Sequence, residues 1–117
     1  MAYNLYTILA EKIETILTRN LTNSRGRDFY DVYILVSMNR ETLSRSELLH
    51  ALHVKAEERD SLSDIVNHEK HLRDIVASPE IAKIWNAYVK SYTYAKGIAL
   101  PDILALIAWI FENGSTE

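Results

Sequence analysis

The chain has 117 residues, of which 48% are hydrophobic and 25% are charged, and its formal net charge at pH 7 is −3. This length and composition are typical of one globular domain that buries about two-thirds of the surface of its unfolded chain. The negative net charge excludes a general electrostatic attraction to polyanions. The lack of cysteine excludes disulfide frameworks and thiolate metal sites.

The spacing of apolar residues predicts two helices in the first third of the chain. Over residues 5–17 the apolar positions recur every three or four residues, which predicts an amphipathic helix, and residues 20–26 interrupt that pattern. A second helix is expected to begin at Arg27 or Asp28 and to stop near Asn39. Asp28 is favoured there because it lies near the positive end of the helix dipole.

The middle of the chain carries signals for two more helices. Ser44 or Ser46 is expected to cap a third helix. Asp60 or Ser61 is expected to open a fourth, which continues to Val76.

The last third predicts two further helices. Residues 78–80 (SPE) combine a capping serine with a proline at the first helical position, and the helix that follows is expected to continue until Gly97. Residues 103–111 form a last helix that is apolar nearly all round, so we expect it to lie centrally and to close at Gly114. No segment alternates with a period of two, and we find no repeat or linker. We therefore predict an all-α, single-domain bundle of about five to six helices.

The N-terminus shows no secretory leader, and the longest apolar run is too short to cross a bilayer. We expect a soluble, cytoplasmic protein that makes no membrane contact.

Lys12 is the first candidate for a functional residue. On a helical wheel it falls between Ile8 and Leu5, inside the apolar arc, whereas Glu11 and Glu14 fall outside it. A lysine at such a position either snorkels, with its stem over apolar surface and its ammonium group in water, or it has a partner or a task.

Charged residues at the start of the second helix are the next candidates. Asp28 and Asp31 share a helix face, where they could hold a metal ion or pair with an ammonium group. Alternatively, Asp28 is a simple N-terminal helix charge and Asp31 pairs with Arg27. Arg25 and Arg27 flank Gly26, so their guanidinium groups could hold phosphate oxygens or form a solvated basic turn.

Four histidines occur in two pairs, His50/His53 and His68/His71, and each spacing places both rings on one helix face. If the third and fourth helices pack side by side, four imidazoles could meet at a metal ion; otherwise they are surface histidines.

Aromatic residues form two groups. Trp85, Tyr88, Tyr92 and Tyr94 could stack on nucleobases, although their spacing is typical of packing in a core or subunit interface. The other group is expected to pack between the first two helices and so to hold Lys12 opposite the aspartates. Its members are Phe29, Tyr30 and Tyr33.

Three segments together resemble a known family. They are residues 9–14 (LAEKIE), residues 23–31 (NSRGRDFYD) and residues 85–98, which contain a Trp-x2-Tyr pattern followed by Tyr-Ala-Lys-Gly-Ile. They are similar to the C-terminal half of the AbiEii/AbiGii toxin family, nucleotidyltransferase-like proteins of bacterial abortive-infection (phage resistance) and toxin–antitoxin systems. The resemblance covers residues 3–111.

The resemblance implies an enzyme of two parts. An N-terminal core carries a metal-binding Asp-x-Asp pair, and a helical C-terminal part supplies a lysine and an aspartate. Here these are Lys12 and either Asp28 or Asp31. Lys12 would contact nucleotide phosphates and the aspartate would orient the lysine or the nucleotide, with Arg25 and Arg27 as further phosphate-binding candidates.

No Asp-x-Asp pair occurs in this sequence. Phosphoryl transfer needs the Mg²⁺ that such carboxylates hold, so we expect the chain to be inactive alone. Residues 1–117 would then be a helical C-terminal domain whose N-terminal catalytic core is absent. We expect no metal site in this chain, with Mg²⁺ and NTP belonging to the complete enzyme and an RNA acceptor implied by the resemblance only.

The alternative is a non-catalytic helical interaction module. It would bind an antitoxin, or a second copy of itself as a homo-oligomer, through apolar surface, and Lys12 would merely snorkel. The first hypothesis instead predicts that the face of Lys12 is exposed or lines a cleft.

Overall fold

The computed structural model describes residues 4–22 and 25–112, and all regular secondary structure in these ranges is helical. This confirms the predicted all-α class. Within the described residues, no helix is long and apolar enough to span a membrane. The α-helices are α1 (Leu5–Arg19), α2 (Gly26–Met38), α3 (Arg45–Glu58), α4 (Leu62–Val66), α5 (His68–Ala77), α6 (Pro79–Ser91) and α7 (Leu100–Phe111), and the 3-10 turns are η1 (Asn20–Thr22) and η2 (Thr93–Ala95).

Two predicted helix caps are confirmed. The Ser44 side chain accepts a hydrogen bond from the backbone N–H of Glu47 and so begins α3. The Ser78 side chain likewise accepts from the N–H of Ile81, with Pro79 at the start of α6. Each serine satisfies a backbone donor that the first helical turn leaves unpaired.

The fourth predicted helix is divided into α4 and α5. Asn67 separates them, and its side-chain amide donates to the backbone carbonyl of Ser63. Such local side-chain bonding competes with a continuous helix. The single expected helix therefore becomes two. As a result, the described residues form seven α-helices, one more than the upper end of the prediction.

The bounds of the last two helices differ from the prediction. α6 ends at Ser91, not near Gly97, because Tyr92 has an extended backbone and η2 follows. Gly97 instead makes a turn at a positive φ of 90°. α7 begins three residues early, at Leu100, since Pro101 fits the first turn of a helix. The predicted end at Gly114 lies outside the described residues.

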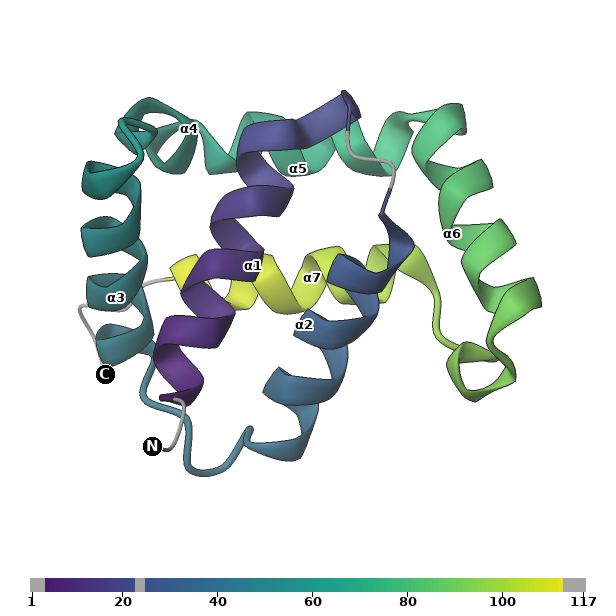
Figure 1. Cartoon of the computed structure of the whole chain (residues 1–117), viewed down its shortest axis with the longest axis horizontal. Coiled ribbons are helices and arrows are strands. Elements are labelled where there is room, and N and C mark those ends of the chain that lie inside the picture. Colours follow the sequence, from purple (N-terminus) through teal and green to yellow (C-terminus); the bar gives the residue numbers. More distant parts are fainter. Residues whose placement is uncertain (1–3, 23–24, 113–117) are drawn as a thin grey trace.

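α7 is central to the packing, as its apolar sequence predicts. It contacts α2, α3 and α5, while α3 and α6 lie toward opposite ends of the long axis (Figure 1). A helix that is apolar on most sides needs neighbours on most sides. Its buried residues are Leu100, Ile103, Leu104, Ile107 and Ile110.

Glu14 corrects the helical-wheel prediction, which placed it outside the packed face of α1. Its side chain is only 3% exposed. Its carboxylate accepts from Arg59 Nη1 at 2.8 Å, from the Ser61 hydroxyl at 2.9 Å and from the Thr18 hydroxyl at 3.0 Å. The turn between α3 and α4, where Asp60 has a positive φ, covers this face of α1 and supplies the Arg59 and Ser61 donors.

We predict that Glu14→Ala lowers the free energy of unfolding by roughly 2–4 kcal/mol, because it removes a buried carboxylate with three hydrogen bonds and leaves the buried Ser61 hydroxyl without its acceptor. Urea denaturation measures this change. Glu11→Ala is the matched control, since it removes an exposed glutamate from the same helix and should leave stability nearly unchanged. Equal effects of the two substitutions would contradict the assigned role of Glu14.

Candidate functional site

The candidate site forms where α1 meets α2. Lys12 lies in the middle of α1, and Asp28 and Asp31 lie in the first turns of α2. The Nζ atom of Lys12 is 2.9 Å from Asp31 Oδ2 and 4.0 Å from Asp28 Oδ1. One ammonium group thus faces both predicted carboxylates, and it joins two helices that neighbour each other in the fold.

Asp28 is the most deeply buried member of the site. Its side chain is 4% exposed, and its Oδ2 atom is buried without a hydrogen-bond partner among the described residues. Buried carboxylates are costly unless positive charge faces them. Three features supply that charge. Arg25 Nη2 lies 3.6 Å and Lys12 Nζ lies 4.0 Å from Asp28 Oδ1, and Asp28 occupies the first turn of α2, near the positive end of the helix dipole.

Both predicted arginines join the site from its exposed side. Arg27 Nε lies 3.5 Å from Asp31 Oδ2, and Arg25 contacts Asp28. The ionic cluster, defined as Lys12, Arg25, Arg27, Asp28 and Asp31, therefore combines three cations with two carboxylates. One positive charge is in excess, which favours an anionic ligand.

The alternative interpretations of these residues hold in part. Asp31 does pair with Arg27, and Asp28 does lie in the first turn of α2. The ammonium group of Lys12, however, does not simply reach water. Its side chain is 25% exposed and its charge is directed at the aspartates of α2. The snorkelling interpretation therefore does not describe this lysine.

The carboxylates of the ionic cluster do not fit a metal ion, because each already faces a cation. Across residues 4–22 and 25–112, no three or more histidine or carboxylate side chains gather as metal ligands would.

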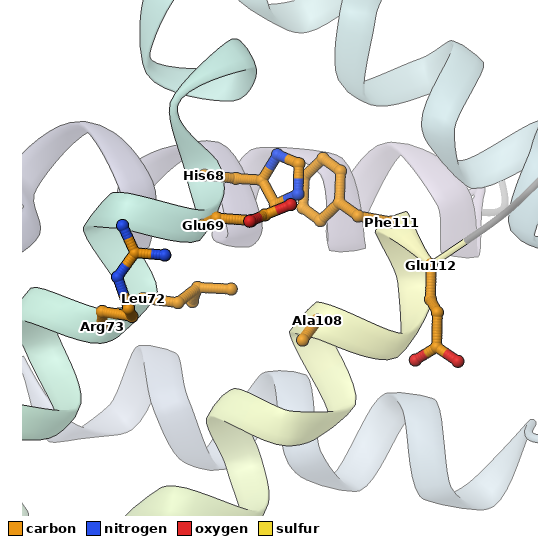
Figure 2. Close-up of a pocket in the computed structure, with 7 residues that line it drawn as sticks. All are labelled: His68, Glu69, Leu72, Arg73, Ala108, Phe111 and Glu112. Atoms are coloured by element: carbon orange, nitrogen blue, oxygen red, sulfur yellow. The ribbon is translucent and has the colours of Figure 1, made fainter.

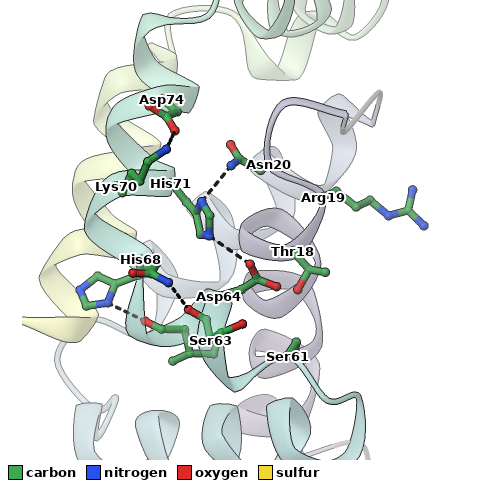
Figure 3. Close-up of polar contacts among 12 residues, drawn as sticks. Thr18, Arg19, Asn20, Ser61, Ser63, Asp64, His68, Lys70, His71 and Asp74 are labelled. Atoms are coloured by element: carbon green, nitrogen blue, oxygen red, sulfur yellow. Dashed lines mark hydrogen bonds and ion pairs between the residues drawn. The ribbon is translucent and has the colours of Figure 1, made fainter.

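The hypothesis of a four-histidine metal site is wrong, because the histidines face different neighbours. His71 bonds to the Asn20 amide and to Asp64 Oδ1, at 2.8 and 3.1 Å, and so links η1, α4 and α5 (Figure 3). His53 bonds to a backbone carbonyl of its own helix, and His50 is exposed.

The fourth histidine, His68, borders a hollow of about 520 Å³ between α5 and α7. Its ring stacks on that of Phe111 with centroids 3.8 Å apart (Figure 2). Glu69, Arg73 and Glu112 place charges of both signs around this hollow. It shares no residue with the ionic cluster.

A smaller pocket of about 250 Å³ adjoins the ionic cluster, and the sequence did not predict it. The start of α2 lines one wall, and tyrosines of α6 and of the segment after it line the other. Its residues are Arg25, Gly26, Arg27, Tyr88, Tyr92 and Tyr94. We call it the tyrosine pocket.

Gly26 explains how the two walls of the tyrosine pocket come together. A Cβ atom at this position would lie 2.7 Å from the Cβ atom of Tyr88, closer than real Cβ atoms approach. Glycine therefore permits the contact between α2 and α6. No glycine pattern in the sequence revealed this, because the partner is more than 60 residues away.

The tyrosines contact one another across the pocket wall. The hydroxyls of Tyr88 and Tyr94 are 2.8 Å apart, and the ring of Tyr92 lies 4.7 Å from that of Tyr88. Tyr30 was expected to pack between the first two helices. Its ring instead faces the α6 side of α2, where its centroid lies 4.8 Å from that of the Tyr94 ring. Phe29 is fully buried in the core.

Burial raises the pKa of the Tyr88 hydroxyl above its usual value of 10.0. The hydrogen bond to Tyr94 and the negative charge of Asp31 act in the same direction. The neutral phenol is therefore favoured in the folded protein.

Comparison with known proteins identifies one family. The family model described as nucleotidyl transferase AbiEii toxin, type IV toxin–antitoxin system, matches residues 1–109, which include the whole ionic cluster. No curated protein and no solved structure matches the chain.

We predict that Gly26→Ala lowers the free energy of unfolding by roughly 1–2 kcal/mol. The strain of forcing α6 away from α2 exceeds the gain in helix propensity. Thermal or urea unfolding measures the change, with the exposed α2 substitution Ser37→Ala as control. A Gly26→Ala protein as stable as the control would show that the close approach is unimportant.

We further predict a loss of stability at alkaline pH. A pKa that folding raises gives stability that is complete below the unfolded value near 10 and is lost as pH rises beyond it. The free energy of unfolding should therefore fall above about pH 10, and it should fall less steeply in Tyr88→Phe. Identical slopes in the two proteins would assign the loss to other groups.

Proposed function

The chain belongs to the AbiEii family of nucleotidyl transferase toxins of type IV toxin–antitoxin systems, and from this premise we propose that it is the helical C-terminal domain of such a toxin. In this proposal Lys12, together with Asp28 or Asp31, contributes to an NTP-binding site. An N-terminal nucleotidyltransferase core, a separate part of the toxin, completes that site.

The convergence of five charged side chains on one helix contact is the observation that supports this proposal. Lys12 is fixed by Asp31 at 2.9 Å, so its ammonium group is oriented before any ligand arrives. A preoriented cation stabilises phosphate charge without the reorganisation that water would need. The excess positive charge of the ionic cluster favours a triphosphate in the same place.

The aspartates position the lysine in this proposal. Asp31 holds the ammonium group on the side of α1 that faces α2, and Asp28 adds negative charge from a buried position. Arg25 and Arg27 lie at the exposed edge, where guanidinium groups bind phosphate oxygens through paired hydrogen bonds.

We assign Mg²⁺ to the proposed N-terminal core, because both carboxylates of the ionic cluster already face cations. In the complete enzyme the metal ion would neutralise charge on the transferring phosphate. The proposal extends to a cytoplasmic toxin that acts in abortive infection and phage resistance and transfers a nucleotide to an RNA acceptor. The family description also implies a cognate antitoxin.

The interaction-module alternative has less support in the structure. Two of the exposed large side chains, Tyr92 and Tyr94, belong to the tyrosine pocket, and the others are spread over η1, α2, α3, α4 and α5. Single exposed apolar residues are normal on monomeric proteins.

Binding of Mg²⁺–ATP to the 117-residue chain tests the proposal. We expect weak, saturable binding, which Lys12→Met reduces at least tenfold because the methionine keeps the stem and removes the charge. Isothermal titration calorimetry measures the affinity. Lys55→Met is the matched control, since Lys55 is also a helical lysine that pairs with carboxylates, here Glu11 and Glu58.

Equal affinities of the two variants would contradict the role of Lys12, as would the absence of binding to the unmodified chain. Circular dichroism of each variant confirms that it is folded, so a loss of binding is assigned to the site.

A further inference from the structure

We propose that the tyrosine pocket binds the base of a nucleotide unit, with the adjoining phosphate at Arg25 and Arg27. This inference rests on the proposed function, because it extends the phosphate site of the ionic cluster to the rest of the ligand. The unit could belong to a free nucleotide or to the end of an RNA strand, and both present the same base and phosphate chemistry.

The first support is the exposed aromatic surface. Tyr92 and Tyr94 are 47% and 57% exposed, so a large part of each aromatic ring faces solvent. Trp85 shows the contrast, since it is 3% exposed and its indole N–H donates to the Ile98 carbonyl. Trp85 packs in the core, whereas Tyr92 and Tyr94 leave ring surface open to a ligand.

The second support is the fixed arrangement of the rings. Tyr94 is held by the hydroxyl contact with Tyr88 and by the ring of Tyr30. Tyr92 lies against Tyr88 and Tyr94, with ring centroids 4.7 and 5.5 Å away. Rings that are already ordered lose little entropy on binding, so stacking contributes more to affinity.

The third support is the size of the pocket and what surrounds it. About 250 Å³ is below the usual range of pockets for drug-sized ligands, which suits one heterocyclic base rather than a whole nucleotide. The opposite wall carries two guanidinium groups, which bind phosphates and also stack on planar rings. A base and its phosphate therefore find matching partners on neighbouring surfaces.

The fourth support is continuity with Lys12. Asp31 contacts both Arg27, which lines the pocket, and Lys12 at the helix contact, so one carboxylate links a residue of the pocket to the proposed phosphate site. A ligand with its base against the tyrosines has its phosphates directed toward the excess charge of the ionic cluster. Because aromatic stacking tolerates every base, we infer a pocket with little base preference.

The test compares three probes on the full chain: inorganic triphosphate, the nucleotides ATP and CTP, and a short single-stranded oligoribonucleotide. We expect Tyr94→Leu and Tyr92→Leu each to weaken binding of the base-containing probes about 5- to 100-fold, while triphosphate binding stays unchanged. Tyr94→Phe is the conservative comparison, because it keeps the ring and removes only the hydroxyl, and it should bind the base-containing probes more tightly than Tyr94→Leu.

The two sources of the nucleotide unit are distinguished by affinity. Tighter binding of ATP and CTP assigns the pocket to a free nucleotide, and tighter binding of the oligoribonucleotide assigns it to an RNA end. Either result supports the inference if, in Tyr94→Leu, the base-containing probe no longer binds more tightly than triphosphate.

Three results would overturn the inference. One such result is that ATP, CTP and the oligoribonucleotide bind no more tightly than triphosphate and that Tyr94→Leu leaves all affinities unchanged. The base then does not enter the pocket, although the proposed function stands. If triphosphate also fails to bind, both proposals fail. If the chain self-associates and Tyr94→Leu abolishes that association without affecting nucleotides, the exposed rings are a protein interface.

Discussion

The contact of the Lys12 ammonium group with the aspartates of α2 determines how the rest of the site is arranged. It brings a cation from the apolar side of α1 against a buried carboxylate, Asp28, and a partly exposed one, Asp31. Neither charge would be tolerable there alone, since an unpaired buried carboxylate or ammonium group carries a large desolvation cost. The same carboxylates attract Arg25 and Arg27, and the result is a charged cluster with an excess of one positive charge.

Packing on the other side of α2 turns this cluster into the edge of a pocket. Gly26 allows Tyr88 to approach the backbone of α2, and Tyr88 in turn orders the neighbouring tyrosines. α2 therefore faces α1 with its aspartates and α6 with its first residues. A substitution that alters the position of α2 is expected to disturb both the charged and the aromatic surfaces, even where it replaces a residue of neither surface.

Much of the fold could be predicted because its signals are local. The caps at Ser44 and Ser78, the apolar stripe of α1 and the apolar circumference of α7 are each readable within a few residues. The position of Lys12 in that stripe, together with the resemblance to AbiEii toxins, led to the residues that do converge. The features that sequence reasoning missed depend on partners far along the chain: Glu14 is buried by the turn after α3, and the tyrosine pocket needs Gly26 and Tyr88 to meet.

In the proposed site the ammonium group of Lys12 meets phosphate charge. The NMR signal of this ammonium group is the most direct test. It is followed in a protein with isotope-labelled lysine side chains while inorganic triphosphate is added. We expect a saturable shift of the Lys12 ammonium signal, while the signal of Lys55, which pairs with glutamates elsewhere, stays constant. A Lys12 signal that does not move, or that moves only together with that of Lys55, would show that Lys12 does not bind phosphate.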